Sequence, residues 1–163
     1  MSLDFFRVSC KYPPISNTVF GLCDNEDGSK AYPDLKNREN WIAEVKNDNQ
    51  LEIVFTAIDK CVINDHEYGG VRRCDGMLTT NQHLYLVELK NQIPPWQSGA
   101  IEQLVSTIEL LVGAHDLSFY KKKKAFACNK KRERFVVIDN EFNLKLFKQT
   151  GFRIDVQAEI IVL

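Results

Sequence analysis

The sequence lacks a long hydrophobic run, and this absence argues against a membrane-spanning protein. No stretch approaches the length of about 18 apolar residues that a membrane helix needs. The first residues, Met-Ser-Leu-Asp-Phe-Phe, contain neither a basic region nor a long apolar core, so we expect no secretory signal. The chain also shows no internal repeat and no linker, and its 163 residues suit one domain spanning 1–163.

Cysteine and histidine patterns typical of zinc sites are also missing. The 5 cysteines are scattered without a Cys-x-x-Cys pair, and the 3 histidines show no metal-ligand spacing. We therefore expect neither a zinc ribbon nor a disulfide framework, and we place the protein in a reducing cytoplasm.

A strong overall charge is lacking too, but the basic residues are unevenly distributed. The net charge of -1 gives no general attraction to nucleic acid. A local basic stripe on such a chain can bind phosphate groups, and the alternative is a solvated loop of lysines. The residues concerned are Lys121, Lys122, Lys123, Lys124, Lys130, Lys131, Arg132 and Arg134.

Hydrophobic periodicity predicts an α/β protein. After an irregular lead-in with at most one short strand, we expect these elements: a helix from Asp34 to about Lys46; strands at Leu51–Asp59, Val71–Leu78 and Leu84–Lys90; a helix at Ser98–Val112; and strands at Ala125–Asn129, Phe135–Asp139 and Phe152–Leu163. The segment from Asn140 to Gln149 alternates like a strand, yet Gly151 resembles a helix stop, so both readings stay open.

The most informative stretch is the hairpin formed by the strands on either side of the polar turn Thr79–Gln82. Strand side chains alternate between faces, so Glu88 and Lys90 share one face. A tight turn places Asp75 opposite Leu86, and a register shifted by two residues places it opposite Glu88. Both registers put Asp75 on the same face. We therefore expect two carboxylates and one amine on one face of an otherwise apolar hairpin.

Such a group is costly to bury without a partner, and a divalent cation relieves the repulsion between the carboxylates. Mg²⁺ is usually held by one or two carboxylates plus waters and phosphate oxygens. A neighbouring lysine could then orient a water or neutralise developing charge. The alternative is a half-exposed strand on which Glu88 and Lys90 form an ordinary surface pair.

Asp75 followed by Glu88-Leu89-Lys90 resembles the signature of the PD-(D/E)XK nuclease superfamily, except that Cys74 stands where the family often has proline. The predicted element order over about 34–129 resembles that family's restriction-endonuclease-like αβββαβ core. The resemblance implies a central mixed sheet flanked by helices, here with extra C-terminal strands.

The resemblance also suggests roles for individual residues. It implies that Asp75, Glu88 and the Leu89 carbonyl hold Mg²⁺ or Mn²⁺, and that Lys90 assists the attacking water. A glutamate on the first helix often adds to the metal site; Glu39 is preferred over Glu44, and both can equally be solvent-facing. A Gln or Lys on the later helix is also common, and Gln103 fits that position.

The expected function is therefore a Mg²⁺-dependent nuclease that hydrolyses DNA phosphodiester bonds. The alternative is a non-catalytic module of the same fold that binds nucleic acid or protein within a defence or repair assembly. DNA is the expected partner and no membrane is expected. A homodimer or a larger protein assembly stays open.

Overall fold

The computed structural model describes residues 3–131 and 138–163, and it is an α/β structure with two mixed sheets. The five-stranded sheet has the strand order β4 (Val54–Ala57), β5 (Gly76–Thr79), β6 (His83–Lys90), β7 (Lys122–Asn129) and β8 (Arg153–Val156). The four-stranded sheet has the order β2 (Tyr32–Asp34), β1 (Val19–Cys23), β3 (Ala43–Lys46) and β9 (Glu159–Ile161). The described helices are α1 (Gln97–Ala114), α2 (Asn140–Thr150) and the short 3-10 helices η1 (Val8–Cys10), η2 (Arg38–Asn40) and η3 (Glu67–Gly69). Within these ranges, no helix is both long and apolar enough to cross a membrane.

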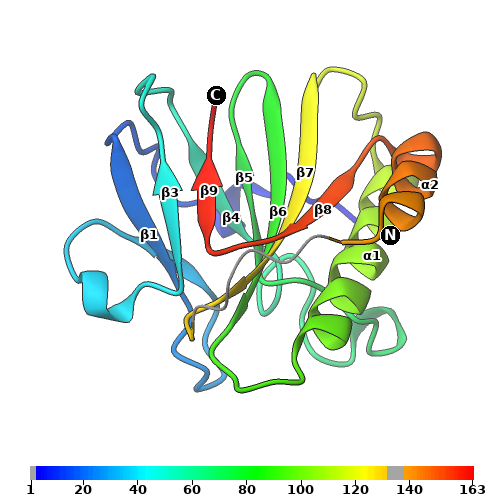
Figure 1. The fold of residues 1–163 in the computed structure, drawn as a ribbon, viewed down its shortest axis with the longest axis horizontal. Helices are drawn as coiled ribbons and strands as arrows, with labels where there is room; N and C mark the ends of the chain where they lie inside the picture. Colours follow the sequence, from blue (N-terminus) through cyan, green and yellow to red (C-terminus); the bar gives the residue numbers. More distant parts are fainter. Residues whose placement is uncertain (1–2, 132–137) are drawn as a thin grey trace.

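The five-stranded sheet changes direction at β6. Strands β4, β5 and β6 form an antiparallel meander, whereas β7 pairs parallel to β6 and β8 parallel to β7. Helix α1 supplies the crossover between β6 and β7, as a parallel connection requires (Figure 1).

Two hydrophobic cores cover the two faces of this sheet. Along β6, Leu84 and Leu86 face a core that also contains Leu104 of α1. The alternate residues Tyr85 and Val87 face a second core shared with the four-stranded sheet. Helices therefore cover one face and the second sheet covers the other (Figure 1). The sequence predicted a central mixed sheet flanked by helices, and the described helices α1 and α2 lie on one face of it.

The predicted helix from Asp34 to Lys46 is also wrong. The Asp34 carboxylate accepts hydrogen bonds from the backbone of Lys36 (3.2 Å) and Asn37 (2.7 Å) and from Trp41 Nε1 (2.8 Å), which fixes a turn instead. From Ala43 onward, buried and half-buried residues alternate, which is the period of a strand.

The first hairpin strand is shorter than predicted because α1 binds the backbone before it. Thr107 Oγ1 accepts a hydrogen bond from Cys74 N at 2.8 Å, and Ser106 Oγ donates to Arg72 O at 2.7 Å. Side chains thus satisfy polar backbone groups in the segment 71–75, and ladder pairing begins at Gly76.

The C-terminal part settles one open reading and corrects another. Residues 140–150 form helix α2, with Asp139 accepting from Glu141 N and Gly151 ending it at φ +82°. The predicted strand Phe152–Leu163 is two strands, β8 and β9, in different sheets. Most of the predicted strand Phe135–Asp139 lies outside the described residues.

Cysteine pairing also differs from expectation. Cys10 and Cys61 form a disulfide, whereas Cys23, Cys74 and Cys128 are free and buried. The scattered cysteines gave no sign of this bridge, because the sequence predicted no disulfide framework.

Candidate functional site

The candidate site lies where β6 approaches its C-terminal end, on the face covered by α1. Gly76 pairs with Val87, so the register carried one residue further places Asp75 opposite Glu88. This is the shifted one of the two predicted registers. The Asp75 Oδ2 atom also accepts a hydrogen bond from Leu89 N at 2.7 Å, which fixes the carboxylate against the end of β6.

Lys90 and Gln103 complete the group. The Lys90 Nζ atom lies 3.1 Å from Glu88 Oε2 and donates to Gln103 Oε1 at 2.8 Å. The Gln103 amide in turn donates to Arg73 O at 3.3 Å. The structure therefore brings together Asp75, Glu88, Lys90 and Gln103, with the Leu89 backbone beside them.

Burial makes the two carboxylates unusual. Asp75 is 7% exposed and Glu88 is 2% exposed. Burial raises the pKa of Glu88 to about 7, although the Lys90 ammonium opposes the shift. Burial and then the Glu88 charge raise the pKa of Asp75 well above its usual range. Both groups thus resist ionisation in the metal-free protein.

One oxygen of this pair lacks a partner. The buried Oε1 atom of Glu88 has no hydrogen-bond partner in the part of the chain that the structure describes. A buried unsatisfied carboxylate oxygen costs free energy, so it calls for an explanation: a cation, or a proton that Asp75 and Glu88 hold between them in the metal-free protein.

The donor set fits Mg²⁺ or Mn²⁺ better than zinc. Asp75 and Glu88 supply carboxylate oxygens, and the Leu89 carbonyl is nearby in sequence. Over residues 3–131 and 138–163, no group of three or more His, Cys, Asp or Glu side chains could hold a metal ion. An ion held by two carboxylates would keep most of its ligands as water or phosphate oxygens, as Mg²⁺ commonly does.

The predicted third carboxylate is not at this site. Glu39 is exposed on η2, and Glu44 lies on β3 of the other sheet, 3.5 Å from Arg38. Because the predicted first helix is absent, nothing carries either residue to the face under α1.

Two residues beside the site, Asp59 and Arg73, were not predicted from the sequence. Asp59 contributes to the raised pKa of Glu88, and its carboxylate lies 2.9 Å from Arg73 Nε. Asp59 ends the predicted strand Leu51–Asp59, so its proximity to the hairpin could have been noticed. These residues border a solvent-open hollow lined by Asp59, Lys60, Asp65, Gly70, Val71, Arg72, Arg73, Lys90 and Gln103.

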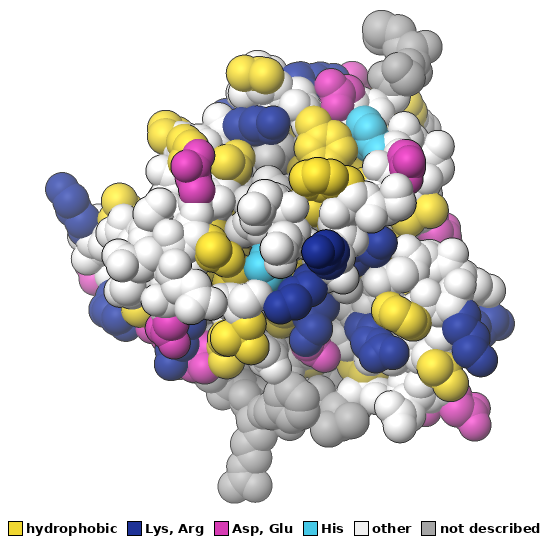
Figure 2. All heavy atoms as spheres, turned by 90° about the horizontal axis from the view of Figure 1, so that it is seen from above, with side chains coloured by type: hydrophobic (Ala, Val, Ile, Leu, Met, Phe, Trp, Pro, Cys, Tyr) yellow, Lys and Arg dark blue, Asp and Glu magenta, His cyan; other side chains and the backbone are white. Residues whose placement is uncertain are grey.

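The basic residues that the structure describes form two groups and not one stripe. Lys122–Lys124 begin β7, whereas Lys130 and Lys131 follow its end, and the eight-residue strand spans about 26 Å. Figure 2 views the end where β7 begins, and Lys and Arg side chains gather there.

The two basic groups also differ in their contacts. At the start of β7, Lys122 Nζ donates to Leu163 O at 2.9 Å and Lys124 pairs with Asp155 at 3.0 Å. At the other end, Lys130 N donates to Lys90 O at 2.8 Å, so this group adjoins the candidate site. Arg132 and Arg134 lie outside the described residues.

Comparisons with known protein families, with curated proteins and with solved structures found no match.

Proposed function

We propose that this protein is a Mg²⁺-dependent nuclease of the PD-(D/E)XK type that hydrolyses DNA phosphodiester bonds. The observation that carries the proposal is the buried Oε1 of Glu88, which has no hydrogen-bond partner among residues 3–131 and 138–163, beside the buried carboxylate of Asp75. Two carboxylates that resist ionisation together become favourable once a divalent cation offsets their charges.

The topology supports the same proposal. The order β4, β5, β6, α1, β7, with an antiparallel meander followed by a parallel strand, resembles the βββαβ part of the restriction-endonuclease-like core. The chain departs from that core at its start, where β3 stands in place of the first helix.

Asp75, Glu88 and the Leu89 carbonyl would hold the ion. When bound, Mg²⁺ would polarise the scissile phosphate and lower the pKa of a coordinated water. The Lys90 ammonium has three N–H donors, and Glu88 and Gln103 accept two of them. The third donor would orient a water or stabilise charge that develops on a phosphate oxygen.

The surroundings support a polyanionic substrate. Lys130 and Lys131 follow β7 at the end of the sheet where Lys90 lies, and both are exposed. Basic side chains beside the reacting phosphate would bind neighbouring phosphates of a DNA backbone.

Calorimetric titration with Mg²⁺ and Mn²⁺ tests the metal site. Wild type should bind either ion, and Asp75→Ala should lose binding because half of the carboxylate pair is gone. Glu109→Gln is the matched control, since Glu109 is exposed on α1 and away from the pair. It should bind as wild type does.

A plasmid-nicking assay in both metals then tests catalysis. Cleavage by wild type and none by Asp75→Ala supports the nuclease. Metal binding without cleavage of duplex, single-stranded or branched DNA would instead favour a binding module. If Asp75→Ala still binds the metal and still cleaves DNA, the assignment of the site is refuted.

A further inference from the structure

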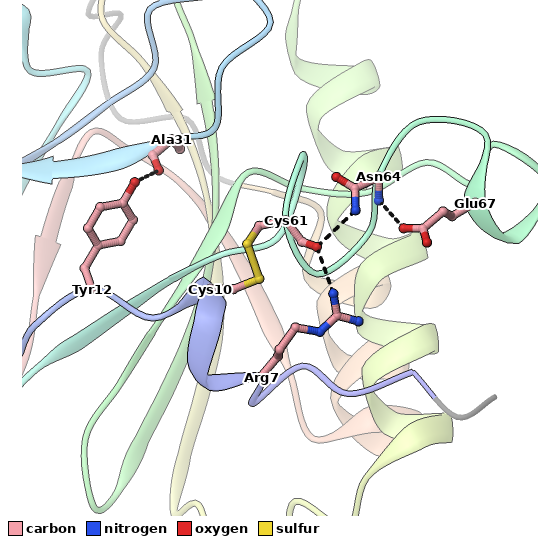
Figure 3. Close-up of a disulfide and its surroundings, with 7 residues drawn as sticks. All are labelled: Arg7, Cys10, Tyr12, Ala31, Cys61, Asn64 and Glu67. Carbon is pink, nitrogen blue, oxygen red and sulfur yellow. Dashed lines mark hydrogen bonds between the residues drawn. A yellow bond between two sulfur atoms is a disulfide. The ribbon is translucent and has the colours of Figure 1, made fainter.

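A series of contacts links the Cys10–Cys61 disulfide to the candidate site, although the disulfide is distant from that site in sequence. It joins the end of η1 to the turn that follows β4 (Figure 3). Cys10 is buried and Cys61 is partly exposed. The Cys61 carbonyl accepts hydrogen bonds from Arg7 and from the Asn64 side chain, each at 3.3 Å.

The Cys10 half of the bridge is attached to the body of the protein on both sides. Before it, the fully buried Phe5 donates its N–H to His115 Nε2 at 3.1 Å. After it, Tyr12 N donates to Phe55 O of β4 at 2.9 Å. Cys10 is thus a fixed point to which the disulfide holds the Cys61 turn.

The Cys61 turn carries the residues that grip Arg73. Asp59 lies 2.9 Å from Arg73 Nε and Asp65 lies 2.5 Å from Arg73 Nη2, while Lys60 pairs with Asp65 at 2.6 Å. We call Asp59, Asp65 and Arg73 the arginine clamp. The Arg73 side chain is only 11% exposed, so the clamp holds a largely desolvated guanidinium.

The clamp is connected to the candidate catalytic lysine. The carbonyl oxygen of Arg73 accepts a hydrogen bond from Gln103 Nε2, and Gln103 Oε1 accepts one from Lys90. The clamp holds the Arg73 side chain and this link runs through the Arg73 carbonyl, so a displacement that reaches the main chain of Arg73 would move the amide that orients the Lys90 ammonium.

We propose that the Cys10–Cys61 disulfide is a redox lock that holds the arginine clamp and thereby positions Gln103 and Lys90. The regulatory role rests on the proposed nuclease function, whereas the mechanical link does not. The reductant is a dithiol. Its thiolate attacks the Cys61 sulfur, and the Cys10 sulfur leaves as a thiolate and takes a proton. The second thiol of the reductant then displaces Cys61 as a thiol and leaves the reductant as a disulfide.

The reduced protein should stay folded. Ile58, Val62 and Ile63 are at most 1% exposed and keep the turn on the core. The turn also retains its backbone hydrogen bonds, including Ile63 N to Ile58 O at 3.0 Å. Loosening should therefore be confined to the clamp and to the exposed residues that follow Asn64.

Hydrogen exchange in the two redox states tests the lock without relying on cleavage. Alkylation of the unfolded chain checks the redox state: it should modify 3 cysteines in the oxidised protein and all 5 after treatment with dithiothreitol. Reduction should speed amide exchange over 64–75 and leave β7 unchanged. Equal exchange over 64–75 in the two states would overturn the proposal.

Cleavage in Mg²⁺ tests the consequence for the site. Reduction should slow cleavage by up to about 100-fold, the scale of a small misplacement of a catalytic group. Cys10→Ser should behave as reduced protein in either condition. Cys23→Ser, which removes a buried free cysteine on β1, is the control and should keep the full redox response.

A clamp variant separates this route from a general loss of stability. Asp65→Asn should slow cleavage in the oxidised protein and shrink the further effect of reduction, because both changes act through Arg73. Independent effects of Asp65→Asn and reduction would refute the clamp as the route. No cleavage in either state, with exchange still redox-dependent, would refute the nuclease and leave the mechanical lock intact.

Discussion

Replacing Glu88 by glutamine should stabilise the metal-free protein above neutral pH while removing its metal site. Glu88 is buried, its Oε1 has no partner among the described residues, and its pKa rises from an ordinary 4.5 to about 7. The protonated acid and the amide are similar in shape. The variant therefore isolates the cost of ionising this side chain inside the fold.

The magnitude follows from the two pKa values. Between pH 4.5 and about 7 the folded protein holds a proton on Glu88 that the unfolded chain has released, so stability falls as the pH rises through this window. Above pH 7 the full cost is present, and it amounts to about 3 kcal/mol at about 1.4 kcal/mol per pKa unit. Glu88→Gln should recover up to about 3 kcal/mol at pH 8 and close to nothing at pH 4.

Urea unfolding with a chelator present measures this difference at both pH values. Added Mg²⁺ should stabilise wild type at pH 8, because it binds the folded state, and should leave Glu88→Gln unchanged. A variant that is less stable than wild type at pH 8 would refute the reasoning. It would show that the carboxylate is held by contacts that favour its charged form.

Three further outcomes are expected. Lys90→Ala should keep the fold and Mg²⁺ binding but lose cleavage by at least about 100-fold in the nicking assay, the scale of removing one preorganised charge; equal activity would exclude a catalytic Lys90. Lys130→Ala should weaken DNA binding and flatten its salt dependence more than Lys122→Ala does, because Lys130 adjoins the site. Filter binding at several salt concentrations measures both effects. A larger effect of Lys122→Ala would place the DNA at the other end of β7. Cys10→Ser should lower the free energy of unfolding by about 4 kcal/mol under oxidising conditions, as the loop-entropy model gives for a separation of 51 residues. A chemical unfolding curve unchanged from wild type would show that the bridge does not form in solution.

The local pattern of apolar and polar residues was sufficient to predict the elements in the centre of the chain. The apolar stripe predicted α1, and the alternation around Glu88 and Lys90 predicted β6 together with the face that they share. In both cases neighbouring residues in sequence set the geometry. Which of the two hairpin registers forms depended on the turn, and sequence alone left that open.

Longer-range effects caused the errors. The helix predicted from Asp34 rested on few apolar positions, and one of them, Leu35, is 47% exposed. The side chain of Asp34 instead forms a turn, and pairing with β1 and β9 draws Ala43–Lys46 into a strand. Tertiary pairing of this kind overrides weak helix propensity. The disulfide was hidden for the same reason, since only the fold brings Cys10 to Cys61.

The division of the last residues between two sheets has a consequence for how the chain folds. Strand β8 pairs with β7 nearby, but β9 pairs with β3, so Glu44 meets Glu159 across most of the chain. Such distant pairing carries a large loop-closure cost and slows folding. Until β9 docks, β3 is an open strand edge that another chain can pair with. During synthesis and refolding this edge is therefore exposed to pairing with other chains.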